Sequence, residues 1–236
     1  MNTSDGDSIF NEWDLYDSIV QFNWMRHREL ATAFRDHLEM YTTPIRVLDL
    51  GCGDGWLAER ILSACSVEQY TGIDSSQAAM DRHAVRPLPG RDVTVAGRNL
   101  LLGDILAELP QLPDADYDVV VASYSLHHFV TEQKETVLHE IGRLVKPTGC
   151  FLWADVIRSN AETREEFLSR LTTEISERWT SLSVEQRMEA VDHIWKCDFP
   201  EREAWMREEL ARWGLAEVQP LFRDDFFGLL SFEKAR

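Results

Sequence analysis

The chain contains 236 residues, 41 of them acidic and 24 basic, which gives a formal net charge of −17 at neutral pH. Hydrophobic residues make up 44% and charged residues 28%, a globular composition that excludes disordered, collagen-like and coiled-coil chains. The acidic excess argues against a nucleic-acid partner, because such binding depends on Lys and Arg side chains that neutralise phosphates. Since the sequence has neither an apolar run of membrane-spanning length nor a basic and apolar leader, we expect a cytoplasmic protein without a membrane partner.

Neither disulfides nor internal boundaries are indicated by the sequence. The four cysteines are scattered without a Cys-x-x-Cys pair, which argues against a disulfide framework and against a thiolate metal site. No segment rich in Pro, Gly or Ser separates two halves of the chain, and a single α/β domain of this length is common. We therefore predict one domain over residues 1–236, and its oligomeric state is left open.

The first part of the chain predicts helices followed by a β-α-β unit. Apolar side chains recur at helical intervals within residues 8–40, which predicts two helices. The apolar run 45–50 then ends at the glycine-rich stretch 51–55, as a strand ends at a turn. A helical pattern and an extended run over residues 70–74 complete the unit.

The alternation of strand and helix continues to residue 156. After a further helix, one strand ends at residues 100–104, and the run 117–122 is apolar on both faces, as in a central strand. A helix capped by Thr131 follows, and a turn at 146–149 leads into a strand over 150–156. Such alternation predicts a doubly wound, mostly parallel α/β sheet whose ligand lies beyond the carboxyl ends of the strands.

The remaining residues divide into a charged helical stretch and two strands. Residues 159–213 are helical in pattern and predict a lid, and the extended runs 215–222 and 225–234 predict an antiparallel hairpin at the sheet edge. The expected parts of the single domain are N-terminal lid helices (1–44), a ligand-binding core (45–156), a helical cap (157–213) and a C-terminal hairpin (214–236).

The sequence of the glycine turn after the first strand distinguishes between several nucleotide-binding families. Gly51 and Gly53 fit the first two positions of a dinucleotide motif, but Trp56 occupies the third, where close helix packing needs a small residue. No Gly-Lys-Ser/Thr sequence follows the turn, which excludes a P-loop. We therefore expect a ligand that is bound by a tight turn and carboxylates.

Residues 47–55, Val-Leu-Asp-Leu-Gly-Cys-Gly-Asp-Gly, closely resemble motif I of the class I S-adenosylmethionine (SAM) dependent methyltransferases. Gly72-Ile73-Asp74 stands where that family has the acidic residue that holds the ribose hydroxyls, and Gly103-Asp104-Ile105 where it has the acidic residue near the adenine. The strand from Tyr117 and the turn 144–149 also match in order and spacing. The resemblance implies a Rossmann-like, seven-stranded sheet that includes the C-terminal hairpin, and SAM as the cofactor.

The same resemblance implies which residues hold the cofactor. An acidic residue at a strand end usually caps the next helix, so it is the joint spacing of Asp74 and Asp104 that favours this assignment. Residues 11–17 resemble the lid of small-molecule family members, in which Tyr16 lies over the cofactor; core packing is the alternative role of this ring. The expected cofactor-binding residues are Asp49, Gly51, Cys52, Gly53, Asp74, Ser75, Asp104, Ile105, Ser123 and Tyr16.

Two histidines are candidate bases for an acceptor that carries a proton. The segment 123–129 follows the central strand and resembles the Leu-His-His segment of small-molecule methyltransferases, in which His127 and His128 lie beside the transferred methyl group. The alternative role of either histidine is packing, with hydrogen bonds to backbone. Together with His193 and Asp198, these two histidines carry the groups of a His/carboxylate metal site, but nothing in the spacing of the four residues demands a shared centre, and no metal is expected.

The expected function is SAM-dependent methyl transfer to the O, N or C atom of a small-molecule acceptor by in-line displacement. The sequence lacks an Asn/Asp-Pro-Pro-Tyr/Phe motif after the fourth strand, which disfavours the enzymes that methylate nucleobase or glutamine nitrogens. Two alternatives remain open. The C-terminal layout resembles carboxy-SAM synthase, which converts the cofactor, and a catalytically silent SAM-binding regulator would keep the same motif.

Overall fold

The computed structural model describes residues 14–90 and 97–234, so residues 8–13 of the predicted N-terminal helical stretch lie outside the described part of the chain. Contacts within the chain define two compact units, and each is described by itself. The core unit consists of the described residues of 29–160 and 199–234, and the helical unit consists of residues 14–28 and 161–198.

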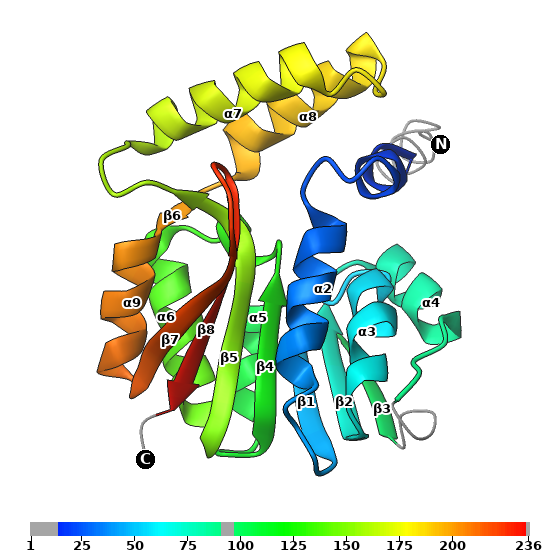
Figure 1. The fold of residues 1–236 in the computed structure, drawn as a ribbon, viewed down its shortest axis with the longest axis vertical. Coiled ribbons are helices and arrows are strands. Elements are labelled where there is room, and N and C mark those ends of the chain that lie inside the picture. The colour runs from blue at the N-terminus through cyan, green and yellow to red at the C-terminus, as the bar shows by residue number, and fades with distance from the viewer. Residues whose placement is uncertain (1–13, 91–96, 235–236) are drawn as a thin grey trace. The chain divides into compact units, whose positions relative to one another are not determined.

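The core unit is built on one eight-stranded sheet (Figure 1). Its path has the order β3-β2-β1-β4-β5-β8-β7, and β6 pairs with β5 beside this path. Strands β1 to β5 run parallel, whereas β8 is antiparallel to β5 and β7. The strands are β1 (Ile45–Leu50), β2 (Val67–Asp74), β3 (Gly97–Leu102), β4 (Tyr117–Ser123), β5 (Val145–Arg158), β6 (Glu201–Arg202), β7 (Leu215–Arg223) and β8 (Phe227–Lys234). The doubly wound sheet and the C-terminal hairpin are confirmed, and β6 is an additional strand.

The central strands send alternating side chains to both faces of the sheet. Leu48 of β1 and Val120 of β4 belong to one hydrophobic cluster. Val47 and Val121, their neighbours along the two strands, belong to the cluster on the opposite face. All four side chains are buried, and burial on both faces is typical of parallel strands.

Helices cover both faces of this sheet (Figure 1). Phe34 and Ile61 anchor α2 and α3 in one cluster, and Leu138 and Met206 anchor α6 and α9 in the other. Because β1 pairs with both β2 and β4, the winding reverses beside β1, where ligands bind in open α/β sheets. The helices of the core unit are α2 (His27–Leu38, in this unit from Glu29 on), α3 (Trp56–Ile61), α4 (Gln77–Val85), α5 (Ile105–Glu108), α6 (Thr131–Leu144) and α9 (Glu203–Arg212), with single turns at η1 (Leu62–Ala64), η2 (Leu109–Gln111) and η3 (Leu126–His128).

The predicted turn at residues 146–149 is wrong, because these residues belong to β5. Val145 already pairs with Tyr117 of β4, and the register then shifts before Cys150 pairs with Val119. The first part of β5 therefore continues directly from the end of α6, and an irregular strand takes the place of a separate turn.

Two further predictions are corrected around α6 and the charged stretch. The N-cap of α6 is Val130, whereas Thr131 donates a hydrogen bond from Oγ1 to Glu201 Oε1 at 3.1 Å. The stretch 159–213 is not a helical cap throughout, because β6 and α9 lie in the core unit. Leu210 of α9 packs in the same cluster as Leu138 of α6.

The helical unit joins two segments that are far apart in the sequence. Residues 14–21 are helical, and the second segment contains α7 (Arg164–Arg178) and α8 (Val184–Cys197). Trp24 stacks on Trp179 with ring centroids 5.7 Å apart, and its Nε1 donates to Ser181 Oγ at 2.7 Å. The N-terminal segment is thereby attached to the turn between α7 and α8. No helix in the described residues combines the length and the apolar character that crossing a membrane requires.

Candidate functional site

The turn after β1 presents glycine backbone at the carboxyl edge of the sheet. Gly51 and Gly53 have φ angles of 70° and 53°, a region that side chains rarely adopt. A Cβ on Gly51 would lie 2.5 Å from Ser125 Cβ, so this position also requires glycine for its close approach to the segment after β4. A Cβ on Gly53 would meet nothing within 4 Å, so that side of the turn has room for a ligand.

Asp74, the last residue of β2, joins this turn to the start of α4. Its Oδ2 accepts a hydrogen bond from the Gly53 N–H at 2.8 Å, and its Oδ1 accepts one from the Ser76 N–H at 2.8 Å. The Gly51 N–H donates to the carbonyl oxygen of Ile73, also at 2.8 Å. The turn is therefore held against the end of β2, and the partly buried carboxylate retains lone pairs for further donors.

Two other predicted residues of the turn region are buried. The Sγ of Cys52 lies 3.8 Å from Met80 Sδ, and burial raises the pKa of its thiol. Asp49 accepts a hydrogen bond from the Tyr70 hydroxyl at 2.9 Å. Burial raises the pKa of Asp49 to about 7, with the Tyr70 hydrogen bond opposing this shift and the charge of Asp74 adding to it. The thiol is thus uncharged, and the carboxyl group titrates close to neutral pH.

The end of β3 brings Asp104 to the same edge. The Gly103 N–H donates to the Asp74 carbonyl oxygen at 3.0 Å, which joins the ends of β2 and β3. Asp104 is exposed and caps α5, with its Oδ1 accepting from the Leu106 N–H at 2.8 Å. Ile105 is 8% exposed and packs in the core. Three carboxylates thus mark the ends of three neighbouring strands, although Asp104 also serves as a helix cap.

The segment after β4 lies against the glycine turn. Ser123 ends β4 and is partly buried, and Ser75, directly after β2, is exposed. The Ser125 hydroxyl donates to the carbonyl oxygen of Leu50 at 2.7 Å, which joins this segment to the end of β1. Since η3 begins at the next residue, the histidine segment starts directly beside the glycine turn.

His127 is held by the carboxylate of Asp155, which belongs to none of the sequence motifs. Its Nδ1 lies 2.5 Å from Asp155 Oδ1, and its backbone N–H donates to Asp155 Oδ2 at 3.2 Å. Burial alone would raise the pKa of Asp155, but the charge of His127 and the hydrogen bonds, including one from Trp153, hold it below its ordinary value. An ionised Asp155 keeps the proton on Nδ1, so the lone pair of a neutral His127 ring is on Nε2.

The two candidate histidines are therefore different. His127 is buried and contacts Asp155, whereas His128 is exposed, with its ring centroid 4.0 Å from that of His127. Asp155 is the single polar residue in the buried stretch 150–157 of β5, whose other side chains are apolar. A single acid in such a strand is the sequence signal that identifies it as a candidate partner.

Tyr16 belongs to the helical unit. Its ring contacts the ring of His27 edge-on, with centroids 6.5 Å apart and planes 89° apart. Its contact with a cofactor remains a prediction. Residues 11–13 of the lid-like segment lie outside the described part of the chain.

The edge formed by β1, β2 and β3 fits the cofactor that the motif implies. SAM carries a sulfonium, an ammonium, two ribose hydroxyls and an adenine amine, which are cations or hydrogen-bond donors. Carboxylates are acceptors for such groups, and the space beside Gly53 admits a ligand against the backbone. The acceptors at this edge are Asp49, Asp74 and Asp104.

Comparisons with known proteins identify relatives by sequence. Residues 47–149 match the family described as Methyltransferase domain. The chain is 27% identical over 168 residues to the uncharacterized methyltransferase YrrT of Bacillus subtilis. This alignment covers 69% of this chain and 72% of that protein. It is 29% identical over 150 residues to the demethylmenaquinone methyltransferase of Leptospira interrogans, covering 62% of this chain and 54% of that protein.

Solved structures share the fold. The magnesium protoporphyrin IX methyltransferase of Synechocystis, solved with bound S-adenosylhomocysteine (SAH), matches with a TM-score of 0.60 and 15% identity over 89% of this chain and 83% of that chain. A SAM-dependent methyltransferase from Mesorhizobium loti matches with a TM-score of 0.54 and 15% identity over 80% of this chain and 91% of that chain. At such identities the likeness concerns the fold alone.

Proposed function

We propose, from the premise that this chain carries a domain of the class I SAM-dependent methyltransferase family, that it methylates a proton-bearing atom of a small molecule with His127 as the base. When bound, SAM supplies an electrophilic methyl group that an acceptor attacks in line. The protein binds and orients the reactants, excludes water and receives the proton. The observation that carries the proposal is the contact between Asp155 and His127 at the edge that also holds the glycine turn.

In this proposal the cofactor is held at the carboxyl ends of β1, β2 and β3. Asp74 would accept hydrogen bonds from the ribose hydroxyls, and Asp104 would face the adenine amine. Asp49, when its carboxyl group is ionised, would attract the ammonium group of SAM. The open side of Gly53 lets the ligand approach the backbone. The remaining members of the proposed set are Gly51, Cys52, Ser75, Ile105, Ser123 and Tyr16.

The role of His127 follows from its tautomer. With Nδ1 protonated and bonded to Asp155, Nε2 is the basic atom that would accept the proton of the acceptor as the acceptor displaces SAH from the methyl group. Asp155 then stabilises the imidazolium, and the proton leaves to solvent. Positioned bases of this kind contribute about 10²- to 10⁴-fold to the rate. His128 is the second candidate, and its exposure makes it the natural control.

Relatives support a small molecule as the acceptor. The name of the Leptospira interrogans protein specifies demethylmenaquinone, and that of the Synechocystis protein specifies magnesium protoporphyrin IX. Each is a metabolite rather than a macromolecule. For this chain we propose the shared chemistry, a small acceptor with an acidic O–H, N–H or C–H group, and not either compound.

Turnover of labelled SAM tests the proposal. Purified protein is incubated with methyl-labelled SAM and a panel of phenols, carboxylic acids, amines and carbon acids, and SAH and labelled products are measured by mass spectrometry. The proposal predicts SAH together with a methylated acceptor, and slow turnover in His127→Gln but not in His128→Gln. Conversion of SAM into a carboxylated cofactor, or full turnover in His127→Gln, contradicts it.

A further inference from the structure

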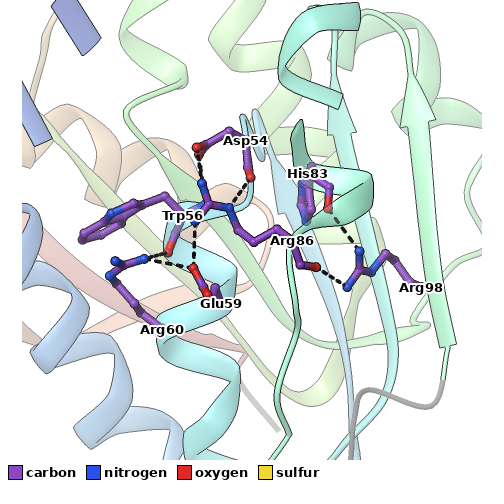
Figure 2. Close-up of polar contacts among 7 residues, drawn as sticks. All are labelled: Asp54, Trp56, Glu59, Arg60, His83, Arg86 and Arg98. Carbon is purple, nitrogen blue, oxygen red and sulfur yellow. Dashed lines mark hydrogen bonds and ion pairs between the residues drawn. The ribbon is translucent and has the colours of Figure 1, made fainter. Parts of the chain in front are cut away.

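A polar network holds the glycine turn from the side of α4 (Figure 2). Arg86 follows the last residue of α4 and donates from Nε to the carbonyl oxygen of Asp54 at 2.7 Å. Its Nη2 donates to Asp54 Oδ2 at 2.5 Å, and its Nη1 donates to Glu59 Oε2 at 2.7 Å. One guanidinium group therefore joins the end of α4 to the glycine turn and to the first turn of α3.

Asp54 is a buried residue that depends on this partner. The residue is 3% exposed, and its Oδ1 accepts a hydrogen bond from the Trp56 N–H at 3.0 Å where α3 begins. A buried carboxylate is costly unless it is paired and hydrogen-bonded. The planar guanidinium of Arg86 satisfies the carboxylate and the carbonyl oxygen of the same residue at once, which an ammonium group does less well. Arg86 therefore holds both the side chain and the carbonyl oxygen of Asp54 in the turn.

The end of α4 is braced separately by Arg98 of β3. Its Nη2 donates to the carbonyl oxygen of Arg86 at 2.8 Å, and its Nη1 donates to those of His83 and Ala84 at 3.1 and 3.0 Å. These carbonyls belong to the C-terminal end of the helix, where a cation is favourable. The guanidinium of Arg98 bonds to the helix end in Figure 2, whereas the guanidinium of Arg86 bonds to the turn and α3.

His83 packs the same helix against the turn. Its side chain is fully buried, and a Cβ on Gly55 would lie 2.6 Å from its Cδ2. Its ring centroid lies 5.4 Å from that of Tyr70 in β2. Burial is the main cause that lowers the pKa of His83 to about 4, so a neutral ring fills the space behind the turn at physiological pH. Helix α4 therefore supports the turn by packing as well as by the Arg86 hydrogen bonds.

From this geometry we propose that Arg86 is a positioning residue for SAM, because it holds Asp54 and thereby keeps the turn in the shape that receives the cofactor beside Gly53. The inference rests on the proposed placement of SAM at this turn. Arg86 acts through Asp54 and does not contact the reacting atoms. Its loss therefore weakens cofactor binding, while proton transfer to His127 in the loaded enzyme is retained.

Two matched arginine variants test this inference. Arg86→Met and Arg98→Met each remove a guanidinium group that donates three hydrogen bonds, but only Arg86 binds Asp54. SAM and SAH dissociation constants are measured by calorimetry, and melting temperatures are measured on the same samples. We expect Arg86→Met to raise both dissociation constants about tenfold or more, the effect of losing one charged hydrogen bond. We expect Arg98→Met to leave both dissociation constants within about twofold of the wild-type values, even if it lowers the melting temperature as much as Arg86→Met does.

Further variants keep the test decisive if Arg86→Met does not fold. The double variant Asp54→Asn, Arg86→Met removes both charges, and its Asn side chain keeps an oxygen for the Trp56 N–H. It is still expected to bind SAM at least about tenfold more weakly than Asp54→Asn alone, and Arg86→Lys restores part of the affinity. The inference is overturned if Arg86→Met and Arg98→Met lose equal affinity for SAM. It is also overturned if the double variant has the same SAM dissociation constant as Asp54→Asn alone. Wild-type protein that binds SAM but methylates no acceptor contradicts the proposed function and leaves this inference standing.

Discussion

The carboxylate of Asp155 lies 2.5 Å from Nδ1 of His127, and the two residues come from adjacent parts of the sheet: Asp155 from β5 and His127 from the turn that follows β4. Because the two strands are parallel neighbours, their carboxyl ends meet at one edge. The pair therefore stands at the sheet edge that also carries the glycine turn, although its two members are 28 positions apart in the chain.

The first prediction concerns this pair. His127→Gln is expected to lower kcat by about 10²- to 10⁴-fold, because the ring that accepts the proton is lost. Asp155→Asn lowers kcat in the same direction, since an amide no longer enforces the Nδ1–H tautomer. Both variants are expected to keep the SAM affinity within about twofold. Single-turnover kinetics and calorimetry separate the two effects, with His128→Gln as the control; an equal loss in His128→Gln argues against the pair.

The second prediction concerns the ribose acceptor. Asp74→Asn is expected to weaken SAM and SAH binding about tenfold or more, because the carboxylate is lost both as a ribose acceptor and as the acceptor of the Gly53 N–H. Asp81→Asn is a suitable control, since Asp81 is an exposed acid on α4 that accepts from Gln77. Calorimetry measures both variants. Affinity that is unchanged in Asp74→Asn removes this residue from the cofactor site.

The third prediction compares two glycines with similar backbone angles. Gly51→Ala and Gly53→Ala both place a side chain in the left-handed region, at a cost of about 1–2 kcal/mol. Gly51→Ala also brings a Cβ to 2.5 Å from Ser125 Cβ, which adds about 1–3 kcal/mol of overpacking. Urea unfolding is expected to show the larger loss of stability for Gly51→Ala. Gly53→Ala is expected to weaken SAM binding more than its loss of stability explains. A larger loss of stability in Gly53→Ala than in Gly51→Ala contradicts this account of the turn.

The fourth prediction is a pH dependence of stability that comes from Asp49. Burial raises the pKa of this carboxyl group to about 7 in the folded protein, whereas an unfolded Asp titrates near pH 4. The folded state therefore holds the proton more strongly, and the stability that Asp49 contributes is complete below about pH 4 and is lost as the pH rises through about 7. Each unit of the shift corresponds to about 1.4 kcal/mol.

Comparison with Asp49→Asn isolates this group, because the many other carboxyl groups titrate equally in both proteins. Unfolding free energies are measured in urea between pH 4 and pH 8. The free energy of the wild type minus that of Asp49→Asn is expected to fall across this range. A difference that stays constant, or rises, means that Asp49 is not a buried carboxyl group with a raised pKa.

Much of the core fold was predictable from the sequence because its signals are local. The apolar run before Gly51 and the acid that ends β2 at Asp74 predict a strand, a turn and a second strand without knowledge of distant contacts. The features that failed depend on such contacts. Residues 146–149 contain Pro and Gly and resemble a turn, but they form an irregular stretch of β5 between Val145 and Cys150, both of which pair with β4. The two-residue strand β6 has no pattern of its own and exists because it pairs with the end of β5.

The site was predictable to a similar degree. Each expected cofactor residue of the core stands at or just after the carboxyl end of β1, β2, β3 or β4, because the glycines and acids that mark these strand ends are local signals in the sequence. Asp155 and Arg86 were missed for a different reason. Neither belongs to a motif, and their importance lies in side-chain contacts with His127 and Asp54 that only the folded chain brings together. Asp155 is marked in the sequence as an isolated acid in an apolar stretch of β5. Arg86 directly follows α4, and no sequence pattern marks it.

The most direct test of the central claim is a calorimetric titration of SAH into the purified wild-type chain, with circular dichroism to establish that the protein is folded. We predict saturable, one-to-one binding that Asp74→Asn weakens and His127→Gln preserves. That result places the cofactor at the edge formed by β1, β2 and β3 and separates cofactor binding from proton transfer. Folded protein that gives no binding heat with SAH or SAM at several temperatures would contradict the account.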